Sequence, residues 1–224
     1  MRHTTHRMVQ TFGALMGLAG LEHGIGEILQ GRVAPSGLMI LSWPGSDFFR
    51  SLGGEPALTI VPDLLWTGIL AVVFSLGFGL WALAFSDRRL SGSALTVMAV
   101  GMLLCGGGIF PPILGMLIAL LAARIQKPLR ENRERMSRQR LEWVAGFWPW
   151  LFGACLAAWL ALCPGLSLLA YYLNLESPSL TVVTIVMVLA TSTATVVLGL
   201  LRDAHLVDIR QPSGSASQTI SERA

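Results

Sequence analysis

The sequence predicts an all-α, polytopic transmembrane helix bundle with about six hydrophobic segments. Hydrophobic residues make up 53% of the 224 residues and charged residues only 13%. Soluble domains, by comparison, are about one quarter charged. Apolar runs close to the roughly 20 residues that cross a hydrocarbon core recur along the chain. Since a globule of this size cannot bury so many such runs, the expected partner is a lipid bilayer.

The first predicted span covers residues 9–29 and the second covers residues 64–85, each close to the length that a bilayer requires. The loop between them holds a short apolar piece, residues 38–43, that cannot cross a membrane. We expect it to lie in the membrane interface with Trp43 as an anchor. A helical turn is expected after Ser46, ending at the two glycines that follow.

Residues 91–123 are too long for one straight span, because a helix of that length would extend about 50 Å. Three glycines and two prolines interrupt the stretch: Gly106, Gly107, Gly108, Pro111 and Pro112. Glycine relaxes the backbone and proline lacks an N–H donor, so a continuous helix is disfavoured. The sequence predicts a third and a fourth segment that form a broken hairpin with a turn around Phe110. One kinked span is the alternative.

The fifth predicted span covers residues 145–162 and ends at Pro164, and the sixth covers residues 180–201. The remaining residues, 202–224, are polar and rich in small side chains, which is typical of a disordered tail. The expected organisation is therefore a helical membrane domain over residues 1–201 and a cytoplasmic tail over residues 202–224.

Basic residues are distributed unevenly around the predicted spans. If residues 91–123 form a hairpin and both termini are cytoplasmic, fourteen basic residues lie inside and only Arg32 and Arg50 lie outside. A single span there leaves twelve inside and four outside in the better orientation. The positive-inside rule therefore favours six segments with both termini in the cytoplasm. The use of arginine over lysine favours a bacterial source. The expected location is therefore the bacterial cytoplasmic membrane.

Seven of the basic residues fall between Arg124 and Arg140, between two predicted spans and interrupted by glutamates. A juxtamembrane cluster of this kind is typical of contact with anionic lipid headgroups. It does not have the continuous basic face that nucleic-acid binding requires, so no nucleic-acid partner is predicted. A homo-oligomer and an unknown membrane partner both stay open.

The first span contains the only acidic residues well inside an apolar run, Glu22 and Glu27, together with His23. A stripe of glycines follows one face of the same helix: Gly13, Gly17, Gly20, Gly24 and Gly31. His23 and Glu27 are four residues apart and border this stripe, which predicts a hydrogen-bonded pair facing protein. Glu22 lies on a different side and is the weaker candidate.

Ionisable groups at membrane depth usually line an ion path or a binding site. The functional hypothesis is therefore that His23, Glu27 and Glu22 bind an ion or solute. The structural alternative is that water reaches Glu27 near the interface while His23 bonds to a neighbouring helix. The glycine–proline break is the second candidate, because unwound backbone exposes groups that coordinate ions or solutes. It is equally explained as the turn of a hairpin.

Motifs of catalysis are missing from the sequence, and the three cysteines lack the spacing of metal ligands. No enzyme activity, metal or cofactor is predicted. Two hypotheses remain. The first is a membrane protein that moves or binds an ion or small solute through its helix bundle. The second is a non-catalytic scaffold or a subunit of a larger membrane complex.

Overall fold

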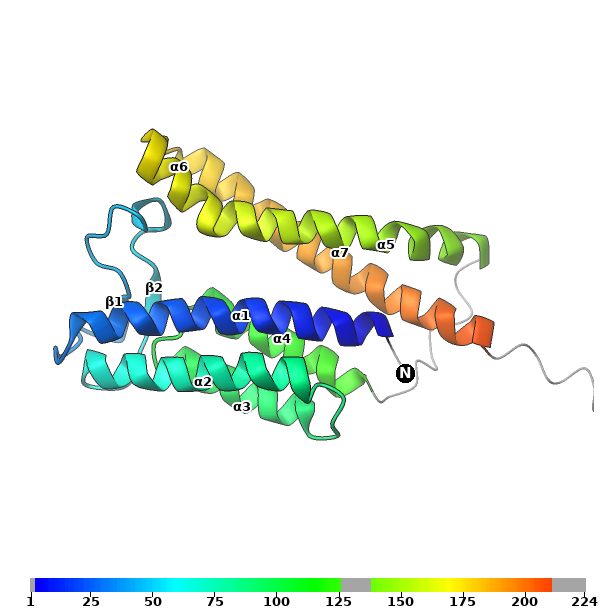
Figure 1. Cartoon of the computed structure of the whole chain (residues 1–224), viewed down its shortest axis with the longest axis horizontal. Helices are drawn as coiled ribbons and strands as arrows, with labels where there is room; N and C mark the ends of the chain where they lie inside the picture. Colours follow the sequence, from blue (N-terminus) through cyan, green and yellow to red (C-terminus); the bar gives the residue numbers. More distant parts are fainter. Residues whose placement is uncertain (1–2, 126–137, 211–224) are drawn as a thin grey trace, which may run out of the picture.

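The computed structural model describes residues 3–125 and 138–210, and its regular structure is almost entirely helical (Figure 1). The helices in chain order are α1 (His3–Gln30), α2 (Leu64–Ala84), α3 (Ser91–Leu104), α4 (Phe110–Arg124), α5 (Arg138–Leu160), α6 (Leu166–Leu173) and α7 (Pro178–Arg210). Among the described residues, three helical stretches are long and apolar enough to cross a membrane, namely α2, Gly146–Leu173 and Pro178–Asp203. The predicted helical membrane protein is confirmed at this level.

α1 and α2 run side by side, and glycines bring their backbones into contact (Figure 1). A Cβ atom added to Gly17 would lie 2.8 Å from the carbonyl oxygen of Ser75, and one added to Gly24 would lie 2.8 Å from that of Gly68. The predicted role of the stripe in close helix approach is therefore confirmed. Gly31 is an exception, because it follows the end of α1 with a φ of 77° and has no neighbour within 4 Å.

The connection between α1 and α2 contains two short antiparallel strands, β1 (Met39–Leu41) and β2 (Pro56–Leu58). The short apolar segment of the loop is therefore a strand, and Trp43 follows it. Its ring stacks on Phe49 at 5.0 Å and covers Gly26 of α1. The turn predicted after Ser46 is present as a 3-10 helix, Arg50–Leu52, ended by Gly53 in the left-handed region.

The helix break predicted in residues 91–123 is present, with α3 and α4 separated by residues 105–109. A Cβ atom on Gly92 would lie 2.5 Å from that of Ala123, so the outer ends of α3 and α4 lie together as in a hairpin. The prolines were wrongly placed in the turn around Phe110. Pro111 and Pro112 instead form the first turn of α4, where a missing N–H leaves no hydrogen bond unmade.

Two features near the C-terminus were not predicted. α5 ends at Leu160, two residues before the predicted end of the fifth span, but a wide turn over residues 161–165 then leads into a further helix, α6. Cys163 adopts an extended backbone (φ −138°, ψ 117°), as expected for a residue before proline, so the chain bends there and then resumes its helix. α7 extends past residue 201 to Arg210, and residues 211–224 of the predicted tail lie outside the described residues.

The helices form two layers, with α1 to α4 in one layer and the α5–α7 hairpin leaning across α1 in the other (Figure 1). α1 is central, since it packs on α2, α4 and α7. At its N-terminus, the carboxylate of Asp203 in α7 accepts hydrogen bonds from the backbone N–H groups of Thr4 (2.9 Å) and Thr5 (2.8 Å). This clamp joins the two layers at one end, and a cavity separates them toward the other.

Candidate functional site

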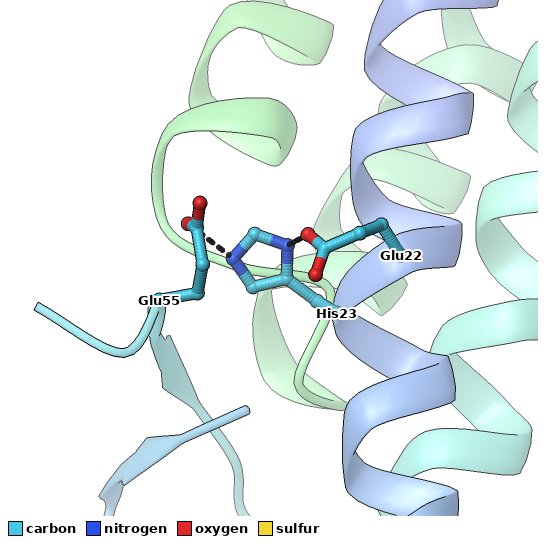
Figure 2. Close-up of side chains that lie close together, drawn as sticks. All are labelled: Glu22, His23 and Glu55. Atoms are coloured by element: carbon cyan, nitrogen blue, oxygen red, sulfur yellow. Dashed lines mark ion pairs between the residues drawn. The ribbon is translucent and has the colours of Figure 1, made fainter. Parts of the chain in front are cut away.

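The imidazole ring of His23 lies between two carboxylates (Figure 2). Its Nδ1 atom is 3.2 Å from Oε2 of Glu22 and 2.9 Å from the carbonyl oxygen of Ala19 one turn earlier in α1. Its Nε2 atom is 3.3 Å from Oε2 of Glu55, which comes from the loop before β2. His23 is only 4% exposed, so its ring is almost entirely enclosed by protein. Glu22, His23 and Glu55 are named the triad below.

An unusual backbone conformation brings Glu55 to this position. It follows Gly53 and Gly54, which have φ angles of 68° and 75°, and its own φ is 56°. A non-glycine residue seldom adopts this left-handed region, and those that do so cluster at functional sites. The carbonyl of Glu55 accepts a hydrogen bond from the N–H of Ser42 at 3.0 Å, which anchors the turn.

Glu27 does not form the predicted hydrogen-bonded pair with His23. It is 0% exposed, and its Oε1 atom accepts a hydrogen bond from the Ser42 hydroxyl at 3.1 Å. The other oxygen, Oε2, has no hydrogen-bond partner among the described residues. The spacing of four permitted the pair, but Nδ1 of His23 turns back toward Ala19 and Glu27 turns toward the loop. Glu22, ranked lower on the sequence, is the true neighbour of His23 on α1.

The glycines of the helix break pack directly on these side chains. A Cβ atom on Gly108 would lie 2.8 Å from Nε2 of His23, and one on Gly106 would lie 2.5 Å from Cδ of Glu27. Both glycines have positive φ angles, 81° and 86°. The two regions singled out by the sequence, the polar turn of α1 and the break, therefore belong to one site.

Some backbone groups at the helix break are already hydrogen-bonded and are therefore not free to coordinate a ligand. The N–H of Gly106 donates to the carbonyl of Leu58 at 2.9 Å, and the carbonyl of Leu104 accepts from the N–H of Ile60 at 3.0 Å. The break thus pairs with β2 and the residues that follow it. Its contribution to the site is the close packing of Gly106 and Gly108 on the side chains of Glu27 and His23.

The triad faces a cavity of about 680 Å³ between α1 and α4 on one side and α5 to α7 on the other. The polar wall is formed by Glu22, His23 and Glu55, and most other lining residues are apolar. They include Leu18, Trp43, Phe110, Trp159, Cys163 and Val188. Glu27 does not line the cavity. The volume of the cavity is within the range of roughly 300–1,000 Å³ that is usual for small-molecule sites.

The triad is also the one group of three or more His, Cys, Asp or Glu residues in the described ranges that lies close enough to hold a metal ion. One ligand atom from each residue lies within 4.8 Å of the others. Sequence reasoning missed Glu55, because nothing in its spacing relates it to α1. The only local signal is an acidic residue directly after two glycines, between the apolar segments of the loop.

Comparisons of the chain with protein-family models, with curated proteins and with solved structures found no match.

Proposed function

We propose that the protein is a multi-pass membrane protein that binds or moves a small and largely apolar solute. The solute would occupy the cavity between the two helical layers. The observation that carries this proposal is the cavity that reaches Glu22 and His23. Apolar walls with a few convergent polar groups are the usual composition of a ligand site. With two carboxylates beside one imidazole, the triad favours a solute whose polar end is cationic or donates hydrogen bonds.

The scaffold hypothesis predicts that the polar residues of α1 are fully packed. Glu27 fits that description, since it is 0% exposed and outside the cavity. Glu22 does not, because its side chain is 28% exposed and lines the cavity. Binding is therefore favoured over a purely structural role. The proposed role is not catalytic, because the sequence carries no motif that pairs a nucleophile with a base.

In this proposal α1, α3 and α4 join the three long apolar stretches as membrane segments, with both termini in the bacterial cytoplasm. α3 and α4 have 14 and 15 residues. At about 1.5 Å per residue, neither reaches across a hydrocarbon core of roughly 30 Å, so their meeting point lies within the membrane, shielded by neighbours. The contact between Gly92 and Ala123 supports a hairpin in which Arg124 lies on the same side of the membrane as Arg88. The basic residues from Arg124 to Arg140 then meet anionic lipid.

Cysteine labelling tests this topology. In a background without native cysteines, Ser46→Cys should react with a membrane-impermeant maleimide in intact cells, and Arg88→Cys should react only after the membrane is opened. Reaction of both from the same side would overturn the six-segment arrangement.

Tryptophan quenching tests solute binding, because Trp43 and Trp159 line the cavity while Trp66 is 50% exposed on the outer surface. Variants that keep a single tryptophan are titrated in detergent with a brominated long-chain alkylamine. Quenching of Trp159 should saturate and should weaken in the Glu22→Gln variant. Quenching of Trp66, the control, should rise in proportion to probe partitioning. The same unsaturable response at both positions would contradict a binding cavity.

A further inference from the structure

We propose that Glu22, His23 and Glu55 bind one divalent first-row transition-metal ion, of the kind represented by Zn²⁺ and Co²⁺, at the wall of the cavity. One imidazole nitrogen and two carboxylate oxygens form a donor set that such ions accept. Three protein ligands leave a coordination position open, as in sites where a metal contacts a solute. This proposal uses the cavity of the proposed function but concerns a different ligand, so each is tested without the other.

The hydrogen bonding of His23 presents the correct nitrogen. A carbonyl oxygen only accepts hydrogen bonds, so the 2.9 Å contact with Ala19 requires the proton on Nδ1. In the neutral ring, the lone pair then lies on Nε2, which faces Glu55. Metal-binding histidines in proteins almost always donate their other N–H to a carbonyl or carboxylate in this way.

The spacing on the Nε2 side suits two ligands of one ion. Nε2 of His23 and Oε2 of Glu55 are 3.3 Å apart. With bonds of about 2.1 Å, neighbouring ligands of a tetrahedral zinc ion lie about 3.4 Å apart. The imidazole and Glu55 therefore need little movement to share an ion placed between them.

Glu22 supplies the third ligand after a rotation of its side chain. One of its oxygens lies within 4.8 Å of a ligand atom of each of the other two residues, but Oε2 lies beside Nδ1, so the carboxylate has to turn toward an ion at Nε2. It is able to do so because the side chain is 28% exposed to the cavity and its Oε1 atom has no hydrogen-bond partner among the described residues. The Ala19 carbonyl still holds the proton of Nδ1 after this rotation.

Gly108 keeps the ring in the orientation that this site needs. An added Cβ atom would lie 2.8 Å from Nε2 and 3.0 Å from both Cδ2 and Cε1. Such nearly equal distances place it over the face of the ring, so Gly108 packs on that face and leaves the edge with Nε2 directed at Glu55. The same arrangement, without an ion, is also explained by a protonated imidazole between two carboxylates. Metal binding decides between the two.

The test uses the full-length protein in detergent, purified through a tag without histidine and stripped of metal. Co²⁺ is titrated and followed by its visible absorption, and Zn²⁺ is then added as a competitor. We expect one Co²⁺ per chain, displaced by Zn²⁺. His23→Asn and Glu55→Gln should each weaken binding at least about tenfold. Glu27→Gln is the matched control, because Glu27 lies on the same helix outside the cavity, and it should bind as the unmodified protein does.

Two controls keep the result interpretable. Thermal unfolding of every variant is measured, so that loss of the fold is separated from loss of a ligand. Cys163→Ser should leave the Co²⁺ spectrum unchanged, since the thiol lines the cavity but is not one of the proposed ligands. No saturable Co²⁺ binding in the unmodified protein, or equal binding by His23→Asn and the control, would overturn the metal site. The tryptophan titration would still stand as the separate test of solute binding.

Discussion

Replacing Gly68 with alanine tests whether backbone contact between α1 and α2 holds the bundle together. The added Cβ atom would press on the carbonyl oxygen of Gly24 and would lie 2.7 Å from the backbone nitrogen of Ile28. Ordinary van der Waals contact begins at 3.4 Å. Because both obstructing atoms belong to the backbone, neither can rotate away, and the helices have to separate.

The size of the effect follows from that separation. The shortfall at Ile28 is about 0.7 Å, and a radial gap of this size removes about a quarter to a half of each neighbouring dispersion contact. Forced overpacking of well-fitted cores lowers the free energy of unfolding by about 1–3 kcal/mol. We expect Gly68→Ala to fall in this range, which corresponds to a decrease in Tm of roughly 2–4 °C for each kcal/mol.

Gly153→Ala is the matched control. Gly153 lies inside α5, and an added Cβ atom there would have no neighbour within 4 Å. Alanine is a better helix former than glycine by up to about 1 kcal/mol, so this variant should be neutral or slightly stabilised. Circular dichroism during heating in detergent micelles gives both Tm values. Equal Tm values for the two variants would refute the claim that glycine contact governs this interface.

Substitutions at Asp203, Glu27 and Trp148 test three further contacts, each by the same thermal unfolding. Asp203→Ala removes the hydrogen bonds at the start of α1 and should lower stability by about 1–2 kcal/mol, and an unchanged Tm would show that the clamp is dispensable. Glu27→Ala should lower stability by about 2–4 kcal/mol, because it leaves a cavity and an unpaired Ser42 hydroxyl. Glu27→Gln should be tolerated, because its amide oxygen still accepts a hydrogen bond from that hydroxyl. An equal loss of stability in both variants would contradict a role for this hydrogen bond. Trp148→Phe removes the 3.0 Å hydrogen bond to the Thr195 carbonyl and should lower stability by about 1 kcal/mol, and no change would mean that α5 and α7 do not rely on it.

The parts of the fold that depend on local pattern were predictable from the sequence. The uninterrupted apolar run of α2 set both of its ends to within a residue. The three glycines of the break disfavoured a continuous helix, and Gly106 and Gly108 do adopt left-handed backbone there. The glycine stripe of α1 likewise identified the face that meets α2.

The parts that depend on tertiary contact were not predictable. β1 has three residues and forms only because β2 lies beside it, so its own sequence shows no alternation long enough to read. α5 ends before Pro164, as expected, but the helix α6 that begins two residues after this proline was not predicted. Glu55 reaches His23 through the fold of a loop. The sequence therefore predicted that α1 holds a polar site but named Glu27 as the partner in place of Glu55.

The central position of α1 has a consequence for membrane insertion. α1 is not among the described helices apolar enough to span a membrane alone, and it carries Glu22 and Glu27 toward the middle of the protein. An acidic residue at the centre of an isolated helix opposes insertion by about 2.5–3.5 kcal/mol, and Glu22 and Glu27, in the C-terminal third of α1, oppose it by a smaller amount. α1 nevertheless precedes its packing partners α2, α4 and α7 in the chain, and α2 is the first of them to follow it out of the ribosome. The two helices are therefore expected to enter the bilayer as a pair, with the apolar α2 carrying its polar neighbour in.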